Sequence, residues 1–128
     1  DWELTMRHGL DFNRIDAWLA AGDARARFFA AISRRTRSWT LEHGRPTLLA
    51  ADALAMAVAI DPSIVTHIET HRVEVELNGA LTRGATVVDW QDRGGRVANA
   101  RIVLGIDQQR FEGLVAAALG VGADIAPG

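Results

Sequence analysis

The sequence predicts an α/β fold that consists mostly of helices and carries a small antiparallel group of strands. Apolar residues recur at helical spacing as far as residue 60, and between residues 71 and 106 the spacing changes to alternation. A last helical segment follows. A chain of 128 residues suits one domain, and we assign residues 1–120 to it and residues 121–128 to a tail.

Two helices are predicted in the first third of the chain. In residues 11–20 the apolar side chains share one helical face, Gly22 is expected to end the helix, and Asp23 can cap the next one. The second helix, residues 24–41, carries five arginines, whose pattern fits either a solvated face or a nucleic-acid surface. The carboxylates Asp16, Asp23 and Glu42 nearby and the formal net charge of −2 favour a solvated face, so we expect no nucleic-acid partner.

The stretch "LLAADALAMAVAIDPS" predicts a third helix with one carboxylate, Asp52, at its start. Every residue from Ala53 to Ile60 is apolar, and the helix is expected to end at Asp61 because the residue before a proline avoids helical geometry. A helix that is apolar on all sides must be surrounded, so something else is expected to pack on it. Asp52 itself has two interpretations: it caps the helix, or it holds a cation or polar ligand.

Alternation begins after His71, where Val73, Val75 and Leu77 are separated by glutamates, as in a strand with one wet face. A turn is expected after it at Asn78-Gly79. The segments "ATVVDW" and "RVANARIVLGI" predict two further strands connected across Gly94-Gly95. Residues 107–119 predict the last helix.

Most familiar chemical motifs are missing from the sequence. There is no cysteine, no phosphate-binding glycine loop and no serine hydrolase elbow. His67 and His71 lie four residues apart and would form a metal pair on a helix, yet Pro62 and the alternation after His71 indicate a loop that enters a strand. Asp52, with Trp39 and His43 shortly before it, is the one suggestive combination of residues.

Hydropathy gives no sign of a membrane partner. No segment approaches the roughly 20 apolar residues that span a bilayer, and the N-terminus lacks the pattern of a signal peptide. We therefore expect a soluble protein, most simply a cytoplasmic one.

The segments "ADALAMAVAIDPS" and "VEVELNGALTRGATVVDW" resemble the C-terminal part of the inosine-uridine preferring nucleoside hydrolases. In that family an aspartate begins an apolar helix that ends in Asp-Pro-Ser, and a strand pair carries a Leu-Thr-Arg-Gly turn. The opening "DWELTMRHGLDF" is similar to the family's segment after its middle strand. The resemblance extends to about Leu119 and implies the C-terminal portion of a nucleoside hydrolase-type, Rossmann-like fold, with the central parallel sheet mostly upstream.

The resemblance also implies an activity and a cofactor. Family members are N-glycosidases that hydrolyse the bond between ribose and base, with a calcium ion that holds the ribose hydroxyls and activates a water. Asp52 matches the C-terminal carboxylate ligand of that calcium. A hard cation prefers such oxygen ligands.

Two departures from the family pattern limit what the resemblance implies. Ala51 stands where many members have histidine and purine-specific members have tryptophan, so Trp39 and His43 are the nearest candidates to assist the leaving base. The family's N-terminal aspartate cluster is also missing from this sequence, which begins with Asp1 in place of Met. We therefore expect an N-terminal segment, on the same or another chain, as partner, and no activity from these 128 residues alone. A nucleoside substrate and a homo-oligomer are the other partners expected; the alternative is a catalytically silent structural or assembly subunit.

Overall fold

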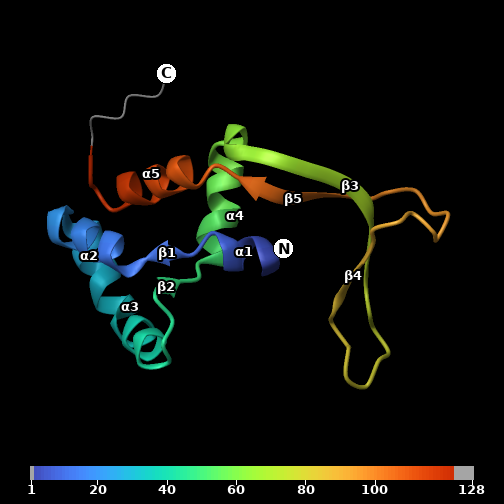
Figure 1. Ribbon diagram of the computed structural model, residues 1–128, viewed down its shortest axis with the longest axis horizontal. Coiled ribbons are helices and arrows are strands. Elements are labelled where there is room, and N and C mark those ends of the chain that lie inside the picture. Colours follow the sequence, from blue (N-terminus) through green and yellow to red (C-terminus); the bar gives the residue numbers. More distant parts are fainter. Residues whose placement is uncertain (1, 123–128) are drawn as a thin grey trace.

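A computed structural model describes residues 2–122. In chain order its elements are α1 (Trp2–Arg7), β1 (Leu10–Asp11), α2 (Phe12–Ala21), α3 (Ala24–Glu42), β2 (Thr47–Leu48), α4 (Ala51–Ile60), the 3-10 turn η1 (Pro62–Ile64), β3 (Val65–Val75), β4 (Thr86–Asp89), β5 (Ala100–Ile106) and α5 (Gln108–Ala118). Figure 1 shows α2, α3 and α5 at one end of the molecule, the three longer strands at the other, and α1 and α4 between them. Most of the predicted tail, from residue 123 onward, lies outside the described residues.

The first predicted helix is confirmed as α2, and its ends follow from single residues. Asp11 is the N-cap, and its carboxylate accepts hydrogen bonds from the backbone N–H groups of Asn13, at 2.8 Å, and Arg14, at 3.3 Å. At the other end the N–H of Gly22 donates to the Trp18 carbonyl. A side chain at position 22 would meet the Ala26 methyl at 2.3 Å, so only glycine fits this close turn into α3.

Replacing Asp11 by alanine is expected to lower the free energy of unfolding by about 1 kcal/mol, because two N–H groups of the first turn of α2 lose their acceptor. Urea denaturation measures the change. The control is Asn13→Ala in the same turn, since Asn13 is exposed and serves the cap through its backbone only. Equal losses in the two variants would contradict the assignment of the cap.

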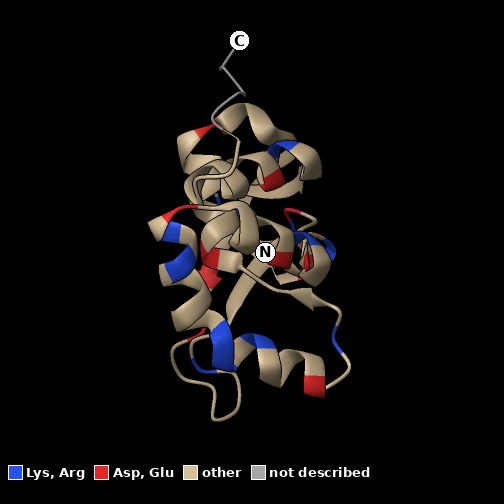
Figure 2. Ribbon diagram, turned by 90° about the vertical axis from the view of Figure 1, so that its left-hand side faces the viewer, with Lys and Arg blue, Asp and Glu red and all other residues tan. Residues whose placement is uncertain are grey.

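The arginine-rich helix is confirmed as α3, with Asp23 as its N-cap. Two of its arginines pair with carboxylates: Arg25 with Asp23 at 2.9 Å, and Arg37 with Asp16 of α2 at 2.8 Å. Figure 2 shows blue and red segments interspersed along the ribbon at this end of the molecule. The arrangement agrees with a solvated helix face.

The longer strands form one antiparallel sheet in which β3 is central and β4 and β5 flank it. The predicted start of this strand was wrong: β3 begins at Val65, six residues before His71, and its first half pairs with β5 from Val65↔Ile106 to His71↔Ala100. A β-bulge between Val65 and Ile68 breaks the alternation there, which hides the strand in the sequence. β5 is correspondingly shorter than predicted, beginning at Ala100.

The core lies where α1, α2, α4 and α5 meet the short β1–β2 pair and the start of the sheet. Phe111, Leu4, Ile15 and Ile64 are its largest fully buried side chains. The other members of the core cluster are Leu10, Phe12, Leu48, Leu54, Ala57 and Ile106. This core packs the helices against one another and leaves most of the sheet beyond it.

The apolar helix predicted to be surrounded, α4, is covered on one side only. Leu54 and Ala57 are buried, whereas Met56 and Ile60 are 60% and 67% exposed. The partner expected on this helix is therefore not supplied by residues 2–122. None of the helices in that described range combines the length and the apolar content needed to cross a bilayer.

Candidate functional site

The position of Asp52 rules out the interpretation that it caps the helix. The N-cap of α4 is Ala50, whose side chain makes no capping hydrogen bond, and Asp52 lies inside the first turn. A carboxylate there still interacts favourably with the helix dipole. The side chain is exposed, and within residues 2–122 it makes no hydrogen bond or ion pair. The Asp52 carboxylate is thus available to a ligand.

Contacts at the far end of α4 fix the helix in place. Asp61 accepts hydrogen bonds from the Ser63 hydroxyl at 2.5 Å and from the Arg110 guanidinium of α5 at 2.8 Å. The Ser63 hydroxyl, with help from Arg110, holds the pKa of the Asp61 carboxyl below its usual range. Arg110 also donates to the Ser63 carbonyl at 3.2 Å. These bonds tie α4 to α5, so Asp52 is carried on an anchored element.

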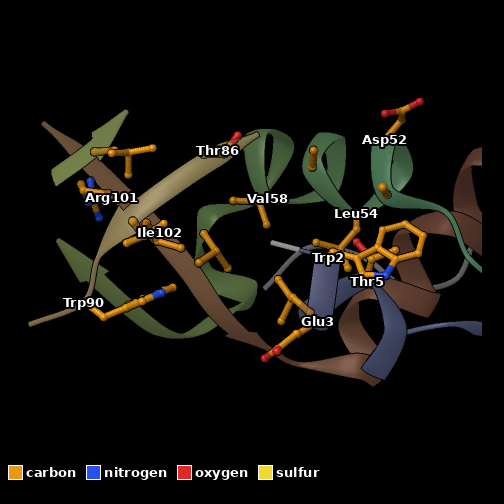
Figure 3. A pocket seen from close by; sticks show the side chains of 17 residues that line it. Trp2, Glu3, Thr5, Asp52, Leu54, Val58, Thr86, Trp90, Arg101 and Ile102 are labelled. Carbon is orange, nitrogen blue, oxygen red and sulfur yellow. The ribbon is translucent and has the colours of Figure 1, made fainter. Parts of the chain in front are cut away.

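Asp52 lines a cleft of about 1100 Å³ between α1, α4 and the sheet. The α1 side contributes Trp2, Glu3, Leu4 and Thr5, the α4 side Ala51, Asp52, Leu54, Ala55 and Val58, and the sheet side Val73, Thr86, Val88, Trp90, Ala100, Arg101, Ile102 and Val103. Figure 3 shows Asp52 and Trp90 at opposite ends of this cleft, with the Asp52 carboxylate turned away from Trp2 and Thr5. The lining is mostly apolar, with the Asp52 carboxylate at its rim.

Trp39 and His43 lie together but not in this cleft. They stack at the end of α3 with ring centroids 4.1 Å apart and an angle of 25° between the rings. The His43 Nδ1–H donates to the Trp39 carbonyl at 2.7 Å, and the Arg45 guanidinium lies 6.0 Å from the Trp39 ring. Neither aromatic side chain lines the cleft beside Asp52, so the structure does not join the three predicted residues into one site.

Ala51 does line the cleft, next to Asp52. Its methyl group can neither transfer a proton nor stack on a base. The aromatic residues that do line the cleft are Trp2 and Trp90, which sequence reasoning missed. They lie 88 residues apart in the sequence, and no local pattern could show that the fold brings them to the same cleft.

The donor set of the described residues fits only part of a calcium site. Calcium takes six to eight oxygen ligands, of which one carboxylate supplies at most two. Among residues 2–122 there is no group of three or more histidine, cysteine, aspartate or glutamate side chains placed to hold a metal ion. Asp52 therefore fits the role of one ligand, and further ligands would have to come from elsewhere.

The two histidines considered as a metal pair are on strand β3 and share a carboxylate instead. Nε2 of His67 lies 3.0 Å from Glu69, and Nε2 of His71 lies 2.8 Å from the other oxygen of the same carboxylate. The loop expected around them is wrong, because both residues lie in the ladder with β5.

Comparison with known proteins gives a consistent result. Residues 1–113 match the family described as inosine-uridine preferring nucleoside hydrolase. The chain is similar to the inosine-uridine preferring nucleoside hydrolases of Crithidia fasciculata, at 38% identity over 68 residues, and Leishmania major, at 40% over 68 residues. Each alignment covers 53% of this chain and 21% of the relative. The non-specific ribonucleoside hydrolase RihC of Salmonella schwarzengrund is 35% identical over 86 residues, which make up 67% of this chain and 27% of that protein.

The fold is similar to the solved structure of an inosine-guanosine nucleoside hydrolase, with a TM-score of 0.81 and 27% sequence identity. The alignment covers 92% of this chain and 37% of that one. The expected fold class is thus confirmed. The chain spans between 21% and 37% of the length of these relatives.

Proposed function

Because the chain belongs to the inosine-uridine preferring nucleoside hydrolase family, we propose that it is the C-terminal part of a nucleoside N-ribohydrolase, which hydrolyses a nucleoside to base and ribose. The observation that carries the proposal is the Asp52 carboxylate, exposed in the first turn of α4 at the rim of the cleft. The names of the relatives include inosine, uridine and guanosine, which supports a ribonucleoside as the substrate class.

In this proposal Asp52 is one carboxylate ligand of a calcium ion. Its backbone is held by α4, which is anchored to α5 through Asp61 and Arg110, so the carboxylate needs little ordering before it binds. When bound, the ion would supply Lewis-acid chemistry at the substrate. The cleft wall next to Asp52 is mostly apolar.

The remaining ligands belong, in this proposal, to an aspartate-bearing segment on the same or another chain. Its docking surface would include the uncovered side of α4, where Met56 and Ile60 are more than half exposed. Burying apolar side chains of this size stabilises an interface by about 1.5 to 3 kcal/mol each. The 128 residues alone are accordingly proposed to be inactive. We also propose that the completed protein forms a homo-oligomer.

A second candidate function is a catalytically silent family member that serves as a structural or assembly subunit. Ala51 favours it, because alanine cannot protonate a leaving base. The coding sequence upstream of Asp1 distinguishes the two candidates. An aspartate cluster there supports the enzyme, and its absence from the coding sequence and from any copurifying chain supports the silent subunit.

The enzyme proposal is tested by base release from inosine, uridine and guanosine in the protein as it occurs in its source. We expect release of base with calcium present, and loss of that activity when a calcium chelator is added, with recovery on return of calcium. The apoprotein should keep its far-UV circular dichroism spectrum, which separates loss of a cofactor from unfolding. Base release that is unaffected by complete calcium removal contradicts the cofactor assignment, and no release from any nucleoside contradicts the activity.

A further inference from the structure

His71 is the one buried histidine among the described residues, and both of its ring nitrogens face carboxylates. Its exposed fraction is 8%. Nε2 lies 2.8 Å from Glu69 on the same strand, and Nδ1 lies 3.4 Å from Asp92 in the connection between β4 and β5. The ring of Trp90 meets it edge to face at 5.1 Å.

This geometry favours a protonated imidazole. A neutral imidazole carries one N–H, so its other nitrogen would present a lone pair to an ionised carboxylate. The imidazolium donates from both nitrogens and satisfies Glu69 and Asp92 together. The connection is therefore held to β3 most firmly in the charged state of His71.

The backbone geometry of the connection, residues 90–99, places Asp92 beside His71. Asp92 has a φ of 52°, a left-handed conformation that is rare for residues other than glycine and better tolerated by aspartate and asparagine. The Asp89 carboxylate accepts backbone N–H bonds from Arg93, at 3.0 Å, and Gly94, at 2.7 Å. These bonds hold the turn on both sides of Asp92.

The far end of the connection is anchored independently of any proton. The backbone N–H of Asn99 donates to the His71 carbonyl at 3.1 Å. Its side-chain amide then accepts from the Val73 N–H at 2.7 Å and donates to the Val73 carbonyl at 3.0 Å, as a paired strand would. Arg96 of the connection also pairs with Glu74 of β3. Since none of these bonds involves the His71 ring, a change of charge on that ring acts on the Asp92 end.

We propose that residues 90–99 form a pH-dependent strap, which protonated His71 closes onto β3 through Asp92 and which opens at its Asp92 end when His71 loses the proton. Trp90 is both the first residue of the strap and part of the cleft wall. Opening of the strap therefore loosens that wall of the cleft.

The charges around His71 set the direction of the response. Glu69, first, and Asp92 raise the pKa of His71 above its ordinary value of 6.5. Asp89 on β4 adds negative charge nearby, and β5 opposes His71 with the uncharged Ala100. A raised histidine pKa means that the stabilisation is complete below about pH 6.5 and is lost as the pH rises through the raised value. The strap is accordingly closed in mildly acidic solution and open in alkaline solution.

Limited proteolysis of the full protein with trypsin measures how accessible the strap is. Arg93 and Arg96 are exposed residues of the strap, and exposed Arg83, in the turn between β3 and β4, provides an internal reference for the pH dependence of trypsin itself. The measured quantity is the rate of cleavage after Arg93 and Arg96 divided by the rate after Arg83. We expect this ratio to rise about tenfold between about pH 6 and about pH 9, as His71 loses its proton.

Asp92→Asn is the decisive variant, because asparagine keeps the shape and tolerates the left-handed backbone. The amide can still form a hydrogen bond but carries no charge, so the ratio should no longer depend on pH, and the same is expected of His71→Gln. Asp16→Asn, which removes an exposed carboxylate paired with Arg37 on α3, should keep the wild-type response. A flat ratio in the wild type, or a wild-type response in Asp92→Asn, overturns the proposal.

Discussion

Replacing Asp52 by alanine is expected to lower calcium-dependent base release by the completed protein more than about 100-fold, since even the loss of a group that only supports a metal ligand costs about 10- to 100-fold. The variant removes the carboxylate at the rim of the cleft, which has no partner in the part of the chain that the structure describes. Asp52→Asn should fall nearly as far, because the amide keeps the shape and one oxygen but not the charge. The measurements are the rate of base release and the calcium dissociation constant from calorimetry.

The free energy of unfolding of the Asp52 variants distinguishes a metal-ligand role of Asp52 from a helix-capping role. Loss of an N-cap costs about 1 kcal/mol, whereas Asp52 lies inside the first turn and Ala50 is the N-cap. We expect Asp52→Ala to lower the free energy of unfolding of the calcium-free protein by no more than about 0.3 to 1 kcal/mol, from the helix dipole. Glu42→Gln is the matched control: Glu42 is also exposed and has no partner within residues 2–122. Unchanged base release in both Asp52 variants would remove Asp52 from the site.

Replacing Phe111 by alanine is expected to lower the free energy of unfolding by about 3 to 5 kcal/mol, because the substitution leaves a cavity in the core. Phe111 is 0% exposed and is the largest fully buried side chain of the described residues. It lies on α5, the helix that also anchors α4 through Arg110. A loss of this size is a large fraction of the 5 to 15 kcal/mol that stabilises a typical domain.

The matched control is Phe28→Ala on α3, since Phe28 is 67% exposed. Its loss should stay within about 0.5 kcal/mol. Urea denaturation of the two variants, followed by circular dichroism, gives both values. Equal losses would show that Phe111 is not part of the core that holds α5 to the other helices.

The helices were predictable because their signals are local. Asp11 and Asp23 cap α2 and α3, Gly22 separates them, and Asp61 ends α4 before Pro62. Each of these signals acts within one turn of the residue that carries it. The prediction failed for the start of β3, since the bulge there removes the alternation and the strand is specified by its pairing with β5, more than 30 residues away.

The residues of the candidate site, too, were predictable from the sequence only in part. The sequence singled out Asp52, Trp39 and His43, but only the fold separates the stacked Trp39 and His43 from the cleft that Asp52 lines. The choice between a cap and a ligand was also open in the sequence. That choice depends on whether the helix begins at Asp52 or two residues earlier, at Ala50. A difference of two residues lies within the usual error of a helix boundary predicted from sequence.

By itself the sequence determined the family, the helices and the presence of an acid at the start of an apolar helix, because these features depend on residues that are close together in the chain. The tertiary structure decided that this acid has no partner among residues 2–122, that these residues leave one apolar side of α4 uncovered, and that His71 lies between Glu69 and Asp92. Those properties depend on contacts between residues distant in the chain, which packing alone brings together.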